Sequence, residues 1–433
     1  MAEVRDFNSY KARGGRKRKG RRAQIPEVDT EPQFSVVPSY EAEERTAPQS
    51  DGRSYQDRIR THRIIVFLRR VLICALIIAA VIAIYFSWRD RHFEEIQITK
   101  SVHLADSAGT TSTRLKSDIL QYSKDGVRLL NADGDPLWNQ TYEMQNPIAR
   151  ICRGVVAIGD YNGHHIYVAG TEGPLGQIDT NLPIRDFCVS AQGVVGAVLD
   201  GQDVTWIYLY DAKGQALASF KTTMKDSGYP ISVSISPSGE LVCVSYLYPE
   251  GGDVKTSVAF FNFGAVGQNA TDNYASGYDY PGEVAPLVQF MNDKAAFALT
   301  NKRIMFYAGS EVPTSQTERF TGEEEVRSVY SNEQYVGLVY SGGEDGAGYK
   351  LQVYNTSGTL ILTRSFDMDY SEILFDDDQI TIYNENEFLI SDFAGNDKFA
   401  GTFPQGVRAM IPTSMRSRYI LVTGSEIQTM ELR

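Results

Sequence analysis

One segment of the chain, Val71–Trp88, runs for eighteen residues without a charged residue, Pro or Gly (VLICALIIAAVIAIYFSW). As an α-helix it would measure about 27 Å, close to the thickness of the hydrocarbon core of a bilayer. Seventy residues precede it, whereas a cleaved signal peptide begins within a few residues of the N-terminus. A buried helix of a soluble domain seldom runs uncharged for so long. The sequence therefore predicts a single membrane-spanning helix over 64–88, between an N-terminal tail (1–63) and a large C-terminal region.

The distribution of basic residues predicts the orientation of this helix. On its C-terminal side lie Arg89, Arg91 and Lys100. On its N-terminal side lie twice as many: Arg53, Arg58, Arg60, Arg63, Arg69 and Arg70. Because the cytoplasmic flank of a membrane helix carries the excess of Lys and Arg, we expect a single-pass protein of the cell membrane with a cytoplasmic tail and an extracytoplasmic C-terminal region. Residues 1–70 carry a net charge of +6 and the whole chain −12, which leaves −18 outside. Such an acidic domain is not expected to bind nucleic acid through general charge.

The tail contains a basic run over 11–22 (KARGGRKRKGRR), in which eight of twelve residues are Lys or Arg. With no large apolar residue it cannot form a core, so we expect the tail to be disordered. The run fits a solvated charge segment that helps to set topology, or one that is attracted to anionic lipid headgroups. Nucleic-acid binding is a third interpretation, although no aromatic residue is present to stack on bases. Residues 27–57 are rich in Glu, Pro, Ser and Gln and read as an extended acidic linker.

Beyond a juxtamembrane linker (89–106), a hairpin pattern recurs along the chain. An apolar strand is followed by a tight turn with Gly and by a second strand that opens with Leu or Phe, as in Leu129–Leu137, Ile207–Leu217 and Leu351–Leu360. A further strand–turn–strand unit precedes the hairpin, as in Val233–Val244. Four short strands every 40–50 residues are typical of the blades of a β-propeller. We therefore expect an all-β propeller over 107–433.

The turn glycines set the expected number of blades. They are Gly134, Gly173, Gly214, Gly264, Gly309, Gly358 and Gly395. One glycine per blade gives seven blades, and six or eight remain alternatives. Closing a propeller requires strands from both ends of the domain to pair, and we expect Val407–Arg433 to pair with strands in Ile119–Tyr142.

Two turns carry a family resemblance. Ser236–Leu241 (SPSGEL) resembles the turn of WD40 and TolB-type propellers, and Ala132–Trp138 (ADGDPLW) resembles the turn of quinoprotein repeats. The layout of a basic tail, one membrane helix and an outer propeller resembles the bacterial membrane family DUF5711. That family has no assigned activity, so the resemblance implies topology and fold, and no site residues.

The cysteines and histidines do not form a metal-binding pattern. Cys152, Cys188 and Cys243 lie on apolar strands of successive blades, none in a C-x-x-C pair. An odd number of cysteines outside the membrane argues against a zinc site and a complete disulfide framework. We expect buried thiols, with oxidation of one pair left open. His164 and His165 are adjacent, so on a strand they would point to opposite faces, and we expect them to be solvent-facing turn residues.

Other chemical motifs are also missing from the sequence. The acidic runs Glu323–Glu325 and Asp376–Asp378 lack the alternating ligands of a calcium loop and read as solvated loops. No phosphate-binding, nucleophile-elbow or metalloprotease motif occurs. We therefore predict no catalytic, cofactor-binding or metal-binding residue and no enzymatic activity. The leading interpretation is a non-catalytic binding or scaffold module at the cell surface, with a protein or glycan ligand on a propeller face. The alternatives are an anchored sensor that relays an external signal through the tail, and a degenerate quinoprotein-like or hydrolytic enzyme.

Overall fold

The computed structural model describes residues 55–89, 93–104, 109–224, 227–322, 324–343, 346–376 and 378–433. The basic run 11–22 and most of the acidic linker lie outside the described residues, as do Glu323 and Asp377. The chain divides into two units, Met1–Ala80 and Val81–Arg433.

The described residues contain a single α-helix, α1, Tyr55–Arg89. Its segment His62–Ile84 has 23 residues with a mean hydropathy of 2.7, none of them buried by other described parts of the chain. This segment is long and apolar enough to cross a bilayer. The helix begins earlier than expected, because residues 55–63, which the sequence analysis assigned to a disordered tail, are helical.

The propeller consists of four-stranded antiparallel sheets, eight of them within the described residues. Blade 1 contains β2 (Thr111–Leu115), β3 (Asp118–Tyr122), β4 (Gly126–Leu130) and β5 (Pro136–Thr141). Blade 2 contains β6 (Pro147–Cys152), β7 (Val155–Asp160), β8 (His165–Gly170) and β9 (Gly173–Asp179). Blade 3 contains β10 (Ile184–Val189), β11 (Val195–Asp200), β12 (Thr205–Tyr210) and β13 (Ala216–Thr222). Blade 4 contains β14 (Tyr229–Ile235), β15 (Leu241–Glu250), β16 (Asp253–Asn262) and β17 (Tyr274–Pro281), with the 3₁₀ turns η1 (Gly267–Asn269) and η2 (Thr271–Asn273) before β17.

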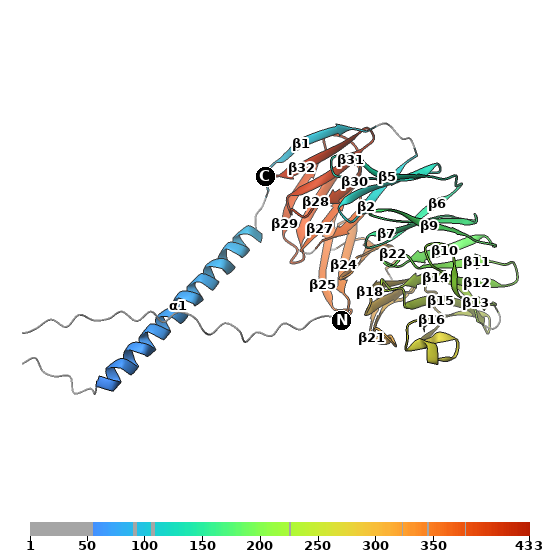
Figure 1. The fold of residues 1–433 in the computed structure, drawn as a ribbon, viewed down its shortest axis with the longest axis horizontal. Coiled ribbons are helices and arrows are strands. Elements are labelled where there is room, and N and C mark those ends of the chain that lie inside the picture. Colours follow the sequence, from blue (N-terminus) through green and yellow to red (C-terminus); the bar gives the residue numbers. More distant parts are fainter. Residues whose placement is uncertain are drawn as a thin grey trace, which may run out of the picture. The chain divides into compact units, whose positions relative to one another are not determined.

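The remaining blades follow in chain order, as the colours of Figure 1 show. Blade 5 contains β18 (Leu287–Asn292), β19 (Ala295–Leu299), β20 (Arg303–Ala308) and β21 (Thr314–Phe320). Blade 6 contains β22 (Val326–Ser331), β23 (Tyr335–Ser341), β24 (Tyr349–Asn355) and β25 (Leu360–Phe366). Blade 7 contains β26 (Glu372–Phe375), β27 (Gln379–Tyr383), β28 (Glu387–Asp392) and β29 (Asp397–Thr402). Blade 8 contains β30 (Val407–Pro412), β31 (Arg418–Thr423), β32 (Glu426–Leu432) and, from the other end of the domain, β1 (Ile96–His103).

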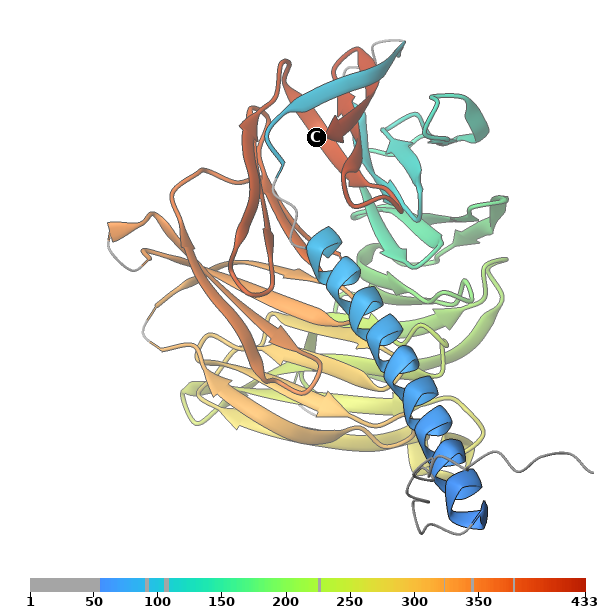
Figure 2. The same ribbon diagram turned by 90° about the vertical axis from the view of Figure 1, so that its left-hand side faces the viewer.

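Strand β1 closes the ring. It pairs antiparallel with β32, from Ile96 opposite Leu432 to His103 opposite Glu426, and Figures 1 and 2 show it beside the last strands of the chain. Two expectations are thereby corrected. The strand that pairs with Val407–Arg433 lies in 96–103, within the segment assigned to a linker (89–106), and not in Ile119–Tyr142. The described residues form eight blades and not seven, because blade 8 takes its fourth strand from β1 and so has no Gly turn to be counted.

The hydrophobic core lies between neighbouring blades. Val156 and Ile158 of β7 pack with Leu120 and Leu129 of blade 1, for example. Every residue of the second strands β7, β19 and β27 is buried, because both faces of each sheet are covered by the adjacent blades. The fourth strands, such as β5 and β13, are largely exposed. The turns that connect the strands lie at the two ends of the sheets, and so at two opposite faces of the ring.

These two faces carry different connections. The turns between first and second strands, and between third and fourth strands, lie on the face where β1 begins and β32 ends, which we call the hairpin face. The turns between second and third strands and the connections between blades lie on the opposite face.

Candidate functional site

A cavity of about 750 Å³ opens on the hairpin face. It is lined by the first-to-second-strand turns of four blades, with residues from β2 and β27 beside them. These turns contribute Lys116 and Ser117 of blade 1, 332–334 of blade 6, Asp376 and Asp378 of blade 7, and 413–416 of blade 8. Four turns that are distant in sequence thus meet at one concave site.

Local hydrogen bonds made by Asn332 fix the shape of the blade 6 turn. The side-chain carbonyl of Asn332 accepts hydrogen bonds from the backbone N–H groups of Gln334 (2.8 Å) and Tyr335 (2.7 Å). This arrangement is a standard way for Asn to stabilise a turn. The side-chain amide of Asn332 donates to the carbonyl oxygen of Phe375 at 2.9 Å, which ties the turn of blade 6 to blade 7. The blade 6 side of the cavity is therefore held in shape by the side chain of Asn332.

Both signs of charge line the cavity. Arg416 pairs with Asp378 at 2.7 Å, and Arg114 pairs with Asp376 at 3.4 Å. Lys116 is exposed and forms no ion pair with any of the residues that the structure describes. The site thus offers one lysine ammonium group beside carboxylate–guanidinium pairs, together with side-chain amides and hydroxyls.

An arginine from the other half of the ring reaches the edge of this cavity. Arg153, in the turn between β6 and β7, donates to both carboxylate oxygens of Glu333 at 2.9 and 3.2 Å. It also lies 3.8 Å from Asp293 of blade 5. The hydrogen bond to Glu333 raises the pKa of Arg153 above its usual value. Blades 2 and 6 lie four positions apart in a ring of eight, so this contact joins opposite sides of the ring.

A second cavity of about 320 Å³ lies among the first strands of blades 2 to 5. Its lining includes the ion pair of Arg150 and Asp186, at 3.2 Å, and the thiols of Cys152 and Cys188. Burial raises the pKa of both thiols above their usual values. Thiols of raised pKa are mostly protonated near neutral pH and are poor nucleophiles.

The histidines and cysteines considered in the sequence analysis do not come together at one site. The Nδ1 atom of His165 lies 2.8 Å from Asp179 on the outer strands of blade 2, whereas that of His164 lies 3.0 Å from the carbonyl oxygen of Thr180. Cys188 and Cys243 are buried as expected, and Cys152 is partly exposed. In the described part of the chain, no group of three or more His, Cys, Asp or Glu is placed to hold a metal ion.

The acidic run at 376–378 has a different setting from the one expected. The sequence suggested a solvated loop, but Asp376 and Asp378 line the cavity and pair with arginines. Sequence reasoning did not find Lys116, Arg153 or Glu333. The sequence feature that these three residues share is their position in turns between first and second strands. An alignment of the blades with one another would have placed those turns on one face.

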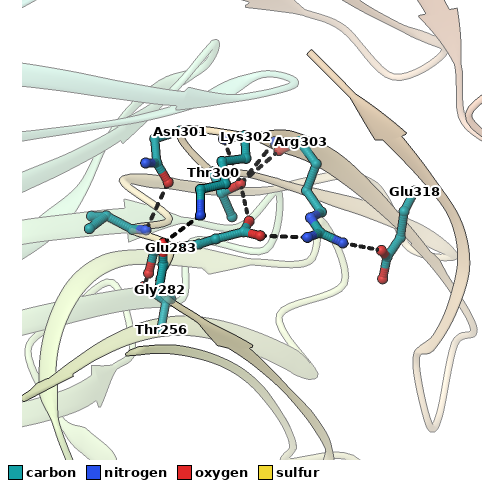
Figure 3. A network of polar contacts seen from close by, with 9 residues as sticks. Thr256, Gly282, Glu283, Thr300, Asn301, Lys302, Arg303 and Glu318 are labelled. Carbon is teal, nitrogen blue, oxygen red and sulfur yellow. Dashed lines mark hydrogen bonds and ion pairs between the residues drawn. The ribbon is translucent and has the colours of Figure 1, made fainter. Parts of the chain in front are cut away.

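A charged network around the buried carboxylate of Glu283 lies at the opposite face, where the connection between blades 4 and 5 passes (Figure 3). The side chain of Glu283 is 3% exposed, and its two oxygens lie 2.7 Å from the hydroxyl of Thr300 and 2.5 Å from Arg303. Arg303 also pairs with Glu318 at 2.9 Å. The carbonyl oxygen of Glu283 accepts a hydrogen bond from Thr256 at 2.8 Å. These oxygens already have partners, so the network joins two blades and offers no open binding site.

Comparison with known proteins places the fold. The C-terminal WD40 domain of Sif2 matches with a TM-score of 0.52 and 10% identity, over 79% of this chain and 99% of that domain. BamB from Moraxella catarrhalis matches with a TM-score of 0.46 and 10% identity, over 78% of this chain and all of that chain. Sqt1 from Chaetomium thermophilum matches with a TM-score of 0.48 and 11% identity, over 78% and 100%. At these identities the match to Sif2 supports the propeller fold alone.

Sequence comparison identifies the family. No curated protein matches the chain. The profile of DUF5711, described as a family of unknown function, matches residues 89–432, which cover the whole propeller and the residues that lead into it. The chain therefore belongs to the DUF5711 family.

Proposed function

We propose that this protein is a membrane-anchored, non-catalytic binding module whose ligand occupies the cavity on the hairpin face. In this proposal α1 spans the cell membrane, the tail is cytoplasmic and the propeller is extracytoplasmic. The excess of Lys and Arg before the apolar segment supports this orientation.

The observation that carries the proposal is the cavity itself. Its volume of about 750 Å³ lies within the range of ligand sites in proteins. Its lining combines Lys116, paired arginines and carboxylates, and the amides of Asn332 and Gln334. Such a surface fits a polar, extended segment of a partner protein, because a peptide offers carbonyl and N–H groups as well as charged side chains.

A protein ligand is favoured over a glycan by the aromatic residues at the site. Phe375 and Tyr419 are the aromatic residues among the described lining residues, and they are 8% and 1% exposed. Buried rings present no open face on which a sugar could stack. A glycan-binding site of this size would be expected to expose at least one ring.

The pairing of the carboxylates that line the described part of the cavity supports a non-catalytic role. Among the carboxylates at the described site, Asp376, Asp378 and Glu333 each pair with an arginine. The thiols in the neighbouring cavity have raised pKa values. A general base or nucleophile instead needs a pKa close to the working pH or a neighbouring base.

Site-specific photocrosslinking in intact cells tests the proposal. A photoreactive amino acid at Gln334, exposed and at the cavity, is compared with one at Ser357, exposed on blade 6 and outside the cavity. We expect an adduct with one partner from position 334 and none from 357, and a weaker adduct when Lys116→Glu is added. Equal adducts from both positions would contradict the site, and a partner recovered in chemically altered form would contradict the non-catalytic role.

A further inference from the structure

Exposed apolar side chains recur near the start of the fourth strand in successive blades. In blades 1 to 6 the first three residues of that strand, or the connection that leads into it, carry at least one large apolar side chain that is 44–54% exposed. The set, which we call the apolar rim, is Leu137, Leu175, Leu217, Val266, Tyr274, Val312 and Leu360. All of these residues lie on the hairpin face. The repetition over six of the eight described blades indicates a shared surface feature of this part of the face, and not a chance exposure of single residues.

The chain also enters the propeller on the hairpin face. The backbone N–H of Phe93 donates to the carbonyl oxygen of Lys398 at 3.1 Å, and the N–H of Glu94 donates to that of Arg433 at 2.6 Å. The side chain of Phe93 packs against the core between blades 7 and 8. The propeller is therefore fixed to the chain from Phe93 onward.

The length of the connection limits how far this point can lie from a membrane. Three residues, 90–92, separate Arg89 from Phe93, and four Cα–Cα steps span about 14 Å at most. The apolar span of α1 ends at Ile84, and five further helical residues add about 7.5 Å. Phe93 is thus held within about 22 Å of the hydrocarbon core of a bilayer that α1 spans.

We propose that the apolar rim contacts the interfacial layer of the bilayer that α1 spans. This inference rests on the membrane anchor of the proposed function. Half-exposed leucines around a face, tethered this close to lipid, can insert their side chains into the boundary between headgroups and acyl chains. In this arrangement the cavity, which opens on the same face, is turned toward the bilayer.

A fluorescent label on the rim of the full-length chain tests the contact. The chain is reconstituted in phosphatidylcholine vesicles that contain lipids with a doxyl quencher near the headgroup. Cys74→Ser and Cys152→Ser remove the accessible thiols, while Cys188 and Cys243 are buried. An environment-sensitive label is placed by Leu217→Cys or Leu360→Cys, on blades 3 and 6. The matched control is Met224→Cys. Met224 is 50% exposed, similar to Leu217 at 54%, but it follows the C-terminal end of β13, whereas Leu217 lies near the N-terminal end.

We expect the labels at 217 and 360 to be quenched about threefold more than the label at 224, and to shift their emission to the blue. High salt should leave this quenching unchanged, because the contact is apolar.

Flotation of the vesicles reports separately on the anchor. Equal quenching at the rim and control positions in floated vesicles would overturn the contact and leave the anchor standing. Energy transfer between rim labels on two chains, without quenching, would show that a second copy covers the rim and would also overturn it. A chain that does not float would overturn the anchor and this inference together.

Discussion

A buried ion pair in blade 7 joins Asp392 and Lys398. The two side chains are 5% and 4% exposed, and Asp392 Oδ2 lies 3.2 Å from Lys398 Nζ. The other oxygen of Asp392 accepts hydrogen bonds from the backbone N–H groups of Ala394 and Asn396, both at 2.9 Å. Burial acts to raise the pKa of Asp392, but the hydrogen bonds from Asn396 and the ion pair with Lys398 outweigh it and lower that pKa below its usual value.

We predict that Asp392→Ala lowers the free energy of unfolding by about 3–5 kcal/mol, because it removes one partner of a buried pair. The matched control is Asp397→Ala in the same blade. Asp397 pairs with Arg364 but is 60% exposed, so its loss should cost less than about 1 kcal/mol. Denaturant unfolding of the full chain in detergent gives both values, and equal costs would contradict the role assigned to burial.

The pH dependence of stability gives the same pair a second test. Because the folded pKa of Asp392 is lowered, the stability it contributes is fully present above its unfolded pKa of about 4. That stability is lost as the pH falls through the folded pKa. The difference in stability between the natural chain and Asp392→Ala should therefore be constant near neutral pH and shrink below about pH 4. If this difference in stability grew on acidification, the pKa of Asp392 would not be lowered in the folded chain.

The residues of the cavity could be predicted only in part. The sequence placed Asp376–Asp378 and the turn of Asn332 in loops, since polar residues between apolar strands are typical of turns. It did not indicate that Arg153 contacts Glu333, 180 residues later. That contact depends on which turns face each other across the ring, and therefore on the number of blades and on how the ring closes.

The glycine turns join neighbouring blades as well as neighbouring strands. Gly358 has φ +75°, and a β-carbon on it would lie 2.6 Å from Cδ2 of Phe306 in blade 5 and 3.0 Å from Cβ of Thr317. The turn of blade 6 thus packs directly on blade 5. A side chain is excluded both by the left-handed backbone and by the close approach.

We predict that Gly358→Ala lowers the free energy of unfolding by about 1–3 kcal/mol through strain and overpacking. The matched control is Gly406→Ala, because a β-carbon there would meet no described atom within 4 Å. That substitution should change stability by less than about 0.5 kcal/mol. Thermal unfolding of both variants checks the prediction, and a neutral Gly358→Ala would contradict the packing of the turn on blade 5.

The period of the blades was predictable, whereas their number and closure were not. The seven glycines do fall between the third and fourth strands or at the first residue of the fourth. All of them except Gly264 have positive φ, which glycine tolerates better than other residues do. They count hairpins, and the eighth pair of strands, β32 and β1, comes from opposite ends of the domain. Nothing local marks Ile96–His103 as a strand of the last blade, since its partner lies more than 300 residues away and the two share no turn.

Closure by β1 gives a prediction at the level of this strand. Replacing Ile96–His103 by a Gly/Ser linker of the same length, eight residues, would leave the edge of β32 unpaired. We expect the chain to lose its single cooperative unfolding transition and to become sensitive to limited proteolysis. The same replacement at residues 27–34 serves as the control. A cooperative transition that survives the loss of β1 would show that the ring closes in another way.

At the scale of the whole molecule, the long apolar helix and the all-β class could be predicted because each depends on a local pattern. An uncharged run long enough to span a bilayer identifies α1, and a repeated strand spacing identifies a propeller. The cavity proposed as the ligand site has no such pattern. It is built from turns of blades 1, 6, 7 and 8, each of which is an ordinary turn in isolation.

The proposed function depends on which side of the membrane holds the propeller, and thiol labelling of intact cells measures this directly. In a background with Cys74→Ser and Cys152→Ser, Met224→Cys places an exposed thiol on the propeller, and Ser50→Cys places one in the tail. A membrane-impermeant maleimide should label position 224 in intact cells and position 50 only after the cells are made permeable. Labelling of position 50 in intact cells, with position 224 protected, would contradict the account.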